Sequence, residues 1–143
     1  MGGVVQLGSA TTKTYCTGQA VIALSSGEAE YYGLVSAISH ALGEQAMLGD
    51  WNIKAEIHIW MDATAGIAIG QRRGLGKVKH IDTTFLWVQE VVNQGRVRVG
   101  KKNTKEMLAD MFTKAVSAPD MVRHMEGMGF KFEEGRSHLG LNL

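Results

Sequence analysis

Cysteine, proline and long apolar runs are scarce in this chain of 143 residues. Its single cysteine, Cys16, excludes an internal disulfide and leaves no thiolate cluster for zinc. No apolar run approaches the roughly 18 residues of a membrane span, and the N-terminus lacks the basic and apolar regions of a secretory signal. We therefore expect no membrane partner and an intracellular location, in the cytoplasm or the nucleus.

Acidic residues are absent from positions 1–27, although the whole chain carries 14 of them. Apart from that gap, the composition is that of a globular protein, with 45% hydrophobic and 20% charged residues. The length fits one domain over residues 1–143, and the sequence shows no repeat, linker or low-complexity segment.

Basic side chains are concentrated between residues 71 and 105, although the net charge of the chain is only +1. This segment holds nine Lys or Arg residues and two acids, so the rest of the chain is negative. Such an asymmetry is typical of a surface that faces a polyanion beside an acidic site, although an ordinary solvated basic face has the same composition. The residues that we assign to nucleic-acid binding are Arg72, Arg73, Lys77, Lys79, His80, Lys101 and Lys102.

Hydrophobic periodicity predicts an α/β protein. Ser25 followed by Glu28 is typical of a capping box, so a long helix is expected to begin near Ser26. The predicted strands cover residues 3–7, 13–24, 56–61 and 96–99, and the predicted helices cover residues 26–48, 63–71, 80–93, 105–116 and 119–128. This order favours helices packed on a mixed sheet.

Three carboxylates stand at the boundaries or on the inner side of apolar elements: Glu30, Asp62 and Asp110. Asp62 follows a predicted strand, which is where sites form in open α/β sheets. An inward-facing carboxylate is costly unless it is paired or binds a cation, and Mg²⁺ prefers such oxygen ligands. Each acid also has a simpler explanation: Glu30 as a charge near a helix N-terminus, Asp62 as a helix N-cap and Asp110 as a solvated residue.

Several blocks of the sequence resemble, in the same order, those of one protein family. Residues 24–32 read LSSGEAEYY, which resembles the LSSTEAEY signature of the ribonuclease H domain of copia-type LTR retrotransposon Pol polyproteins. Residues 59–68 read IWMDATAGIA, residues 79–82 read KHID and residues 107–114 read MLADMFTK, similar to the family's CDNQSAIA, KHID and QLADILTK blocks. The resemblance covers about residues 3–129 and leaves 130–143 as a C-terminal tail.

This resemblance implies the ribonuclease H fold, a mixed sheet flanked by helices, and a four-acid site that binds Mg²⁺, with Mn²⁺ as an alternative. Glu30, Asp62 and Asp110 match three of those acids, so all three are expected to be catalytic and to bind metal. The implied reaction is metal-assisted hydrolysis of the RNA strand of an RNA–DNA hybrid. The implied partner is the upstream reverse transcriptase portion of the polyprotein. His80, in the KHID block, is expected either to contact substrate phosphate or simply to begin a helix.

The family's first aspartate lies on a central strand before Gly3, and this chain, which is N-terminally truncated by comparison, lacks that strand. Either the chain is a fragment with unpaired strand edges, or the sheet has closed around the gap. Two functional hypotheses stay open. The chain is a ribonuclease H domain whose fourth acid is upstream or lost, or it is a non-catalytic remnant that binds nucleic acid or has a structural role.

Overall fold

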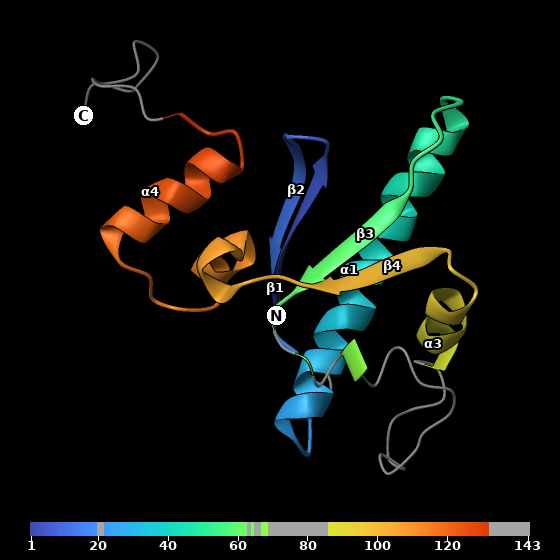
Figure 1. Cartoon of the computed structure of the whole chain (residues 1–143), viewed down its shortest axis with the longest axis horizontal. Helices are drawn as coiled ribbons and strands as arrows, with labels where there is room; N and C mark the ends of the chain where they lie inside the picture. Colours follow the sequence, from blue (N-terminus) through green and yellow to red (C-terminus); the bar gives the residue numbers. More distant parts are fainter. Residues whose placement is uncertain (20–21, 63, 65–66, 69–85, 132–143) are drawn as a thin grey trace.

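The computed structural model describes residues 1–19, 22–62, 64, 67–68 and 86–131 of the chain (Figure 1). Over these residues the protein is α/β, as predicted. The strands are β1 (Gly2–Leu7), β2 (Ala10–Cys16), β3 (Ile57–Met61) and β4 (Val97–Lys101), and the helices are α1 (Ser26–Asp50), α3 (Leu86–Asn93) and α4 (Ala118–Gly127). Two short 3-10 turns, η2 (Thr104–Glu106) and η3 (Leu108–Phe112), connect β4 to α4. In the described part, no helix is both long enough and apolar enough to cross a membrane.

The described strands form two separate sheets of two strands each. β1 pairs with β2 in an antiparallel hairpin, and β3 pairs with β4 in parallel. Figure 1 shows the hairpin and β3 diverging from a common region near the N-terminus. The described residues of β1 and β3 each keep one edge without a strand partner, so the two pairs are not joined into one sheet.

The hairpin consists of a two-residue turn and antiparallel backbone pairing between β1 and β2. Leu7 pairs with Ala10, so only Gly8 and Ser9 form the turn, and Gly8 adopts a φ of 63° that glycine tolerates best. The second strand was predicted over residues 13–24, but β2 ends at Cys16. The last pair of the ladder joins Cys16 to Gly2, and beyond it the Thr17 amide donates to the Met1 carbonyl at 2.8 Å.

Helix α1 begins where the capping box predicted it. The Ser25 hydroxyl accepts a hydrogen bond from the Glu28 amide at 3.2 Å, and a Glu28 carboxylate oxygen accepts one from the Leu24 amide at 2.9 Å. Glu28 is almost fully buried, at 1% exposure, so this cap is part of the packed interior. The helix then runs without interruption to Asp50.

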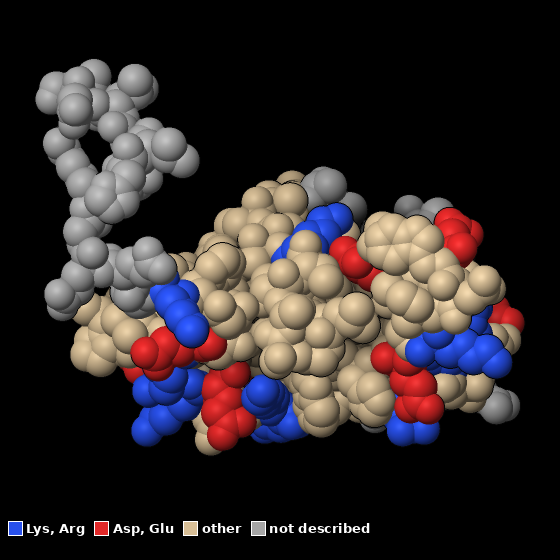
Figure 2. Space-filling view, turned by 90° about the horizontal axis from the view of Figure 1, so that it is seen from above, with Lys and Arg blue, Asp and Glu red and all other residues tan. Residues whose placement is uncertain are grey.

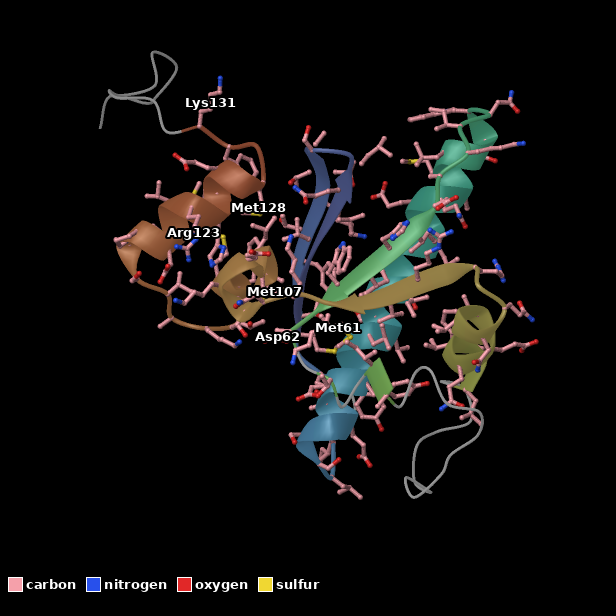
Figure 3. All side chains as sticks on the ribbon, viewed as in Figure 1. Met61, Asp62, Met107, Arg123, Met128 and Lys131 are labelled. Carbon is pink, nitrogen blue, oxygen red and sulfur yellow. The ribbon has the colours of Figure 1, made fainter. Side chains whose placement is uncertain are left out.

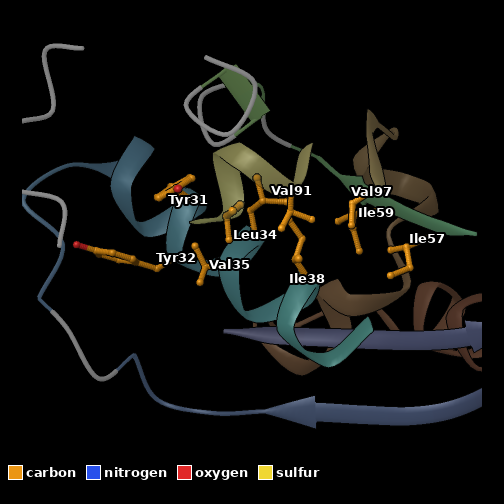
Figure 4. Packing of buried hydrophobic residues seen from close by; sticks show 10 residues of the cluster. Tyr31, Tyr32, Leu34, Val35, Ile38, Ile57, Ile59, Val91 and Val97 are labelled. Carbon is orange, nitrogen blue, oxygen red and sulfur yellow. The ribbon is translucent and has the colours of Figure 1, made fainter. Parts of the chain in front are cut away.

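The hydrophobic core lies between α1, α3, β3 and β4 (Figure 4). One face of α1 buries its apolar side chains against α3 and the parallel strand pair. The buried members of this core are Tyr31, Tyr32, Leu34, Val35, Ile38, Ile57, Ile59, Val88, Val91 and Val97. None of them comes from the β1–β2 hairpin, so the hairpin is attached by other contacts.

Contacts with the C-terminal segment and with α1 hold the hairpin in place, the latter through Lys13, whose Nζ lies 3.2 Å from His40 Nδ1. The Gln6 side-chain amide donates to the Gly127 carbonyl at 3.1 Å, and the Thr11 hydroxyl donates to the Met128 carbonyl at 2.8 Å. At the other end of the hairpin, the Cys16 thiol donates to the Phe112 carbonyl at 2.9 Å. The hairpin therefore packs beside η3 and α4 and lies outside the main core.

One predicted helix is wrong. Residues 105–116 were expected to form an α-helix capped by Thr104, but they form η2, η3 and non-helical backbone. The side chain of Asn103, one residue earlier, accepts from the Lys105 amide at 3.1 Å, and Met107 is extended with φ −81° and ψ 97°. This extended residue breaks the segment into two short turns.

One of the other predicted helices agrees with the structure, and two lie partly outside the described residues. α4 is close to the predicted range 119–128, because Ser117 caps it and a proline occupies its first turn. α3 agrees with the end of predicted helix 80–93, whose start lies outside the described residues. Most of predicted helix 63–71 also lies outside them.

Charges of both signs are interspersed on the face shown in Figure 2, where blue and red side chains lie side by side. Ion pairs of this kind are present in the structure: the Arg98 guanidinium lies 3.4 Å from the Glu56 carboxylate. On that face the described residues therefore form no uniform basic surface.

Candidate functional site

Asp62 and Asp110, which are far apart in the sequence, converge on the side chain of Lys114. The Lys114 Nζ lies 3.0 Å from Asp110 Oδ1 and 3.4 Å from Asp62 Oδ2. The Asp110 side chain is 13% exposed and that of Asp62 is 34% exposed, whereas Lys114 reaches in from a more open position. The structure thus joins two of the three predicted acids through one ammonium group.

The local chain geometry explains this convergence. Asp62 follows Met61, the last residue of β3, so the strand delivers its carboxylate to the carboxyl end of the parallel pair. Asp110 lies in η3, and the Lys114 amide donates to the Asp110 carbonyl at 2.8 Å. This turn places Lys114 and Asp110 four residues apart on one side, where a lysine and a carboxylate meet.

Glu30 lines the same cleft as Asp62, Asp110 and Lys114, from the first turns of α1. In the part of the chain that the structure describes, no three His, Cys, Asp or Glu side chains are grouped closely enough to hold a metal ion together. The three predicted acids therefore share one cleft, and Asp62 and Asp110 are joined through a common cation.

The two carboxylates stabilise the positive charge of the Lys114 ammonium group. Its hydrogen bond to Asp110 is the largest cause that raises the pKa of Lys114 above the ordinary 10.5, so the side chain is charged at neutral pH. An ammonium held between two carboxylates stands in for a bound cation, and the hard oxygen donors are those that Mg²⁺ prefers.

Two of the predicted nucleic-acid-binding residues lie next to this cluster. Lys101 ends β4 and pairs in register with Met61, and the Lys102 amide donates to the Met61 carbonyl at 2.7 Å. Both lysines therefore stand at the carboxyl end of the strand pair, beside Asp62. The other residues assigned to nucleic-acid binding, Arg72, Arg73, Lys77, Lys79 and His80, lie outside the described residues.

The acid cluster opens into a cleft of about 750 Å³. β1 lines one side along its whole length, β3 lines the other, and α1 contributes a row of residues between them. Figure 3 places Asp62 and Met61 close to Met107, where the end of β3 meets the segment after β4, and all three residues line the cleft. The cleft therefore extends along β1 and β3 to the carboxylates of Asp62 and Asp110.

Sequence reasoning missed Lys114 and the cleft. Lys114 had a usable signal, because it follows Asp110 by four residues, the spacing at which opposite charges meet on a helical turn. The cleft had no local signal, since it arises from the separation of strands that are distant in the sequence.

Comparison with known proteins shows a similarity to a polyprotein. The chain is 29% identical over 100 residues to the Retrovirus-related Pol polyprotein from transposon TNT 1-94 of Nicotiana tabacum, an alignment that covers 68% of this chain. It spans only 8% of that polyprotein's length. No protein-family model matches the chain. No solved structure matches it either. The expected relationship to a retrotransposon Pol polyprotein is thus supported, and the ribonuclease H assignment stays a prediction.

Proposed function

We propose that this chain forms most of a ribonuclease H-type nuclease domain of a retroelement polyprotein, which cleaves the RNA strand of RNA–DNA hybrids. One observation carries the proposal: Asp62 and Asp110 share a single cation, Lys114 Nζ, at the mouth of a cleft that Glu30 also lines. The similarity to a Pol polyprotein supports the same assignment.

Charge explains why this cluster suits phosphodiester chemistry with a divalent ion. Two carboxylates and one ammonium leave a net negative charge, which repels the phosphate of a nucleic acid. Glu30, Asp62 and Asp110 would hold Mg²⁺ or Mn²⁺ through their oxygens. When bound, such an ion supplies charge that stabilises the phosphate and lowers the pKa of the attacking water.

The protein's own residues would orient the substrate. Lys101, the last residue of β4, and Lys102 after it would contact backbone phosphates beside Asp62. Such contacts position a nucleic acid without reading its sequence. An RNA–DNA hybrid would be recognised by the shape of its groove and by its 2′-hydroxyl groups.

A non-catalytic role is the second candidate, and one observation favours it. Lys114 already neutralises part of the charge on Asp62 and Asp110, and residues 1–27 contain no acid that completes a set of four. Under this alternative the chain binds nucleic acid, or serves as a structural part of the polyprotein, without hydrolysing anything.

A cleavage assay separates the two candidates. The purified chain is incubated with a hybrid labelled on its RNA strand, with Mg²⁺ or Mn²⁺, beside Asp62→Asn and the matched control Asp50→Asn at the exposed end of α1. The nuclease proposal expects slow cleavage of the RNA strand that Asp62→Asn abolishes and Asp50→Asn retains. If the chain is folded by circular dichroism and binds the hybrid without cutting it, the non-catalytic candidate replaces the first.

A further inference from the structure

The parallel pair β3–β4 has one buried face and one exposed face. Ile57 and Ile59 are 7% and 9% exposed and belong to the core. His58 and Trp60 lie on the opposite face, because neighbouring residues of a strand point to opposite sides. The His58 side chain is 43% exposed and Trp60 is 54% exposed. We call this side of the strand pair the outer face, and its indole is available to a ligand.

Trp60 is seated on a glycine of the neighbouring strand. The two strands pair in register here, with Trp60 opposite Gly100. A Cβ built on Gly100 would lie 2.7 Å from Trp60 Cζ3 and 3.0 Å from Cε3, so the six-membered ring of the indole lies against the glycine. Any larger residue at position 100 would displace the ring. The sheet therefore holds a flat aromatic surface in place while more than half of the residue stays open to solvent.

β4 and the residues around it supply positive charge beside this indole. Val97 is 1% exposed and faces the core, so Arg98 and Gly100 alternate with it on the outer face. Lys102 comes two residues after Gly100 and lines the same cleft as Trp60. A basic residue thus stands two positions to each side of the glycine under the indole. Residues 91–105 contain no acid and five basic residues, which are Arg96, Arg98, Lys101, Lys102 and Lys105.

An aromatic ring between cations along an extended strand suits one class of ligand. Proteins that bind single-stranded nucleic acid combine a basic track for the phosphates with aromatic side chains on which bases stack. A double helix keeps the faces of its bases inside its own stack, so only an unpaired base can lie on Trp60. The charge of β4 complements the phosphates of such a strand.

We propose that the outer face of β3–β4 binds single-stranded nucleic acid, with one unpaired base stacked on Trp60 and the phosphates beside it on Arg98 and Lys102. This binding needs no divalent ion and no hydrolysis, so it does not depend on the nuclease proposal. Because Asp62 follows Trp60 by two residues, a strand bound here would lie beside the acid cluster.

Glu56 limits the strength of this site. Its carboxylate lies 3.4 Å from the Arg98 guanidinium and 3.6 Å from His58 Nε2. A phosphate must therefore compete with Glu56 for Arg98. The side chains of Arg98 and Glu56 are 68% and 73% exposed, so solvent screens their ion pair and a phosphate can replace the carboxylate. Glu56→Gln removes the competitor and should tighten binding about threefold.

An oligonucleotide titration tests the proposal on the whole chain. The probe is a fluorescently labelled oligothymidylate of about twelve nucleotides, followed by anisotropy at low salt with EDTA present. Trp60→Ala should weaken binding about tenfold, and Trp60→Phe, which keeps an aromatic ring, should weaken it less. The matched control is Trp51→Ala at the end of α1, which removes a tryptophan that is 66% exposed and should leave binding unchanged. Circular dichroism checks that each variant is folded.

Two further variants test the seat of the indole and the phosphate contact. Gly100→Ala keeps Trp60 but moves its ring, and should weaken binding about threefold. Arg98→Gln should reduce the slope of log Kd against log salt by about 0.7, the value for one phosphate contact on a single strand, whereas Arg98→Lys should keep the slope.

Several outcomes would overturn the single-strand site. These are equal effects of Trp60→Ala and Trp51→Ala, equal affinity for a blunt duplex of the same length, or no binding at 0.1 mM-scale probe. An oligouridylate of equal length separates the two sources of a single strand, because tighter binding of that probe identifies RNA and tighter binding of the oligothymidylate identifies DNA. Loss of hybrid cleavage with intact, Trp60-dependent oligothymidylate binding would refute the nuclease proposal alone.

Discussion

Replacing Lys114 by methionine tests directly whether Asp62 and Asp110 form a cation site. The substitution keeps an unbranched side chain and removes the ammonium that lies 3.0 Å from Asp110 and 3.4 Å from Asp62. The Lys114 side chain is 52% exposed, so solvent screens both pairs. Exposed ion pairs are worth about 0.2–1 kcal/mol each, which gives roughly 1 kcal/mol for the two together.

This magnitude sets the expected change in metal affinity. A divalent ion that enters between Asp62 and Asp110 must displace the ammonium, so removing Lys114 removes a competitor worth roughly 1 kcal/mol. Since 1.4 kcal/mol corresponds to a factor of ten, Mn²⁺ should bind about fivefold more tightly to Lys114→Met. Without metal, the two carboxylates lose their shared counter-charge, and the unfolding midpoint should fall by about 2–4 °C.

Isothermal titration with Mn²⁺ and thermal unfolding with and without Mn²⁺ measure these effects. The matched control is Lys105→Met, which removes one positive charge from the exposed turn η2 nearby. The reasoning is refuted if Mn²⁺ binds Lys114→Met no better than it binds the unmodified chain. It is also refuted if Lys105→Met gives the same gain, because the effect would then follow from net charge alone.

Two further predictions concern the core and α1. Ile38→Ala should lower the free energy of unfolding by about 2–5 kcal/mol in a denaturant titration, since Ile38 is fully buried, whereas Ile22→Ala, at a residue that is 87% exposed, should change it by less than about 0.5 kcal/mol. Equal losses would contradict the described core. The pKa of His40 is held below 6.5, first by burial and then by the nearby Lys13, so its contribution to stability is complete above pH 6.5 and is lost as the pH falls through the lowered pKa. A proton NMR titration should give a higher His40 pKa in Lys13→Gln, and an unchanged value would exclude Lys13 as a cause.

Local signals were sufficient for several elements of the fold. The Ser25–Glu28 pair marked the start of α1, and the alternation around Ile57 and Ile59 identified the buried face of β3. The segment after β4 shows the limit of such signals. Its apolar spacing favoured a helix, but the extended backbone of Met107 interrupts it, and the segment follows its packing against the hairpin and α4.

The sequence singled out Asp62 and Asp110 as candidate site residues, but it did not predict that Lys114 joins them. Asp62 and Asp110 were chosen because each follows or interrupts an apolar element, and the structure brings both to one cation. Lys114 was overlooked, although it follows Asp110 by four residues, the spacing at which opposite charges meet on a helical turn. The placement of Arg72 and His80 cannot be compared, since both lie outside the described residues.

The sequence by itself determined several of the local elements, the order of the three acids and the absence of any acid in residues 1–27. These properties depend on side-chain type and short-range spacing, which the sequence states directly. Only the tertiary structure decided that the described strands form two separate two-stranded sheets and that a cleft lies between β1 and β3. It also decided that Lys114 bridges Asp62 and Asp110. Strand pairing and side-chain distances of this kind join residues far apart in the chain, and they are fixed by backbone hydrogen bonding and packing.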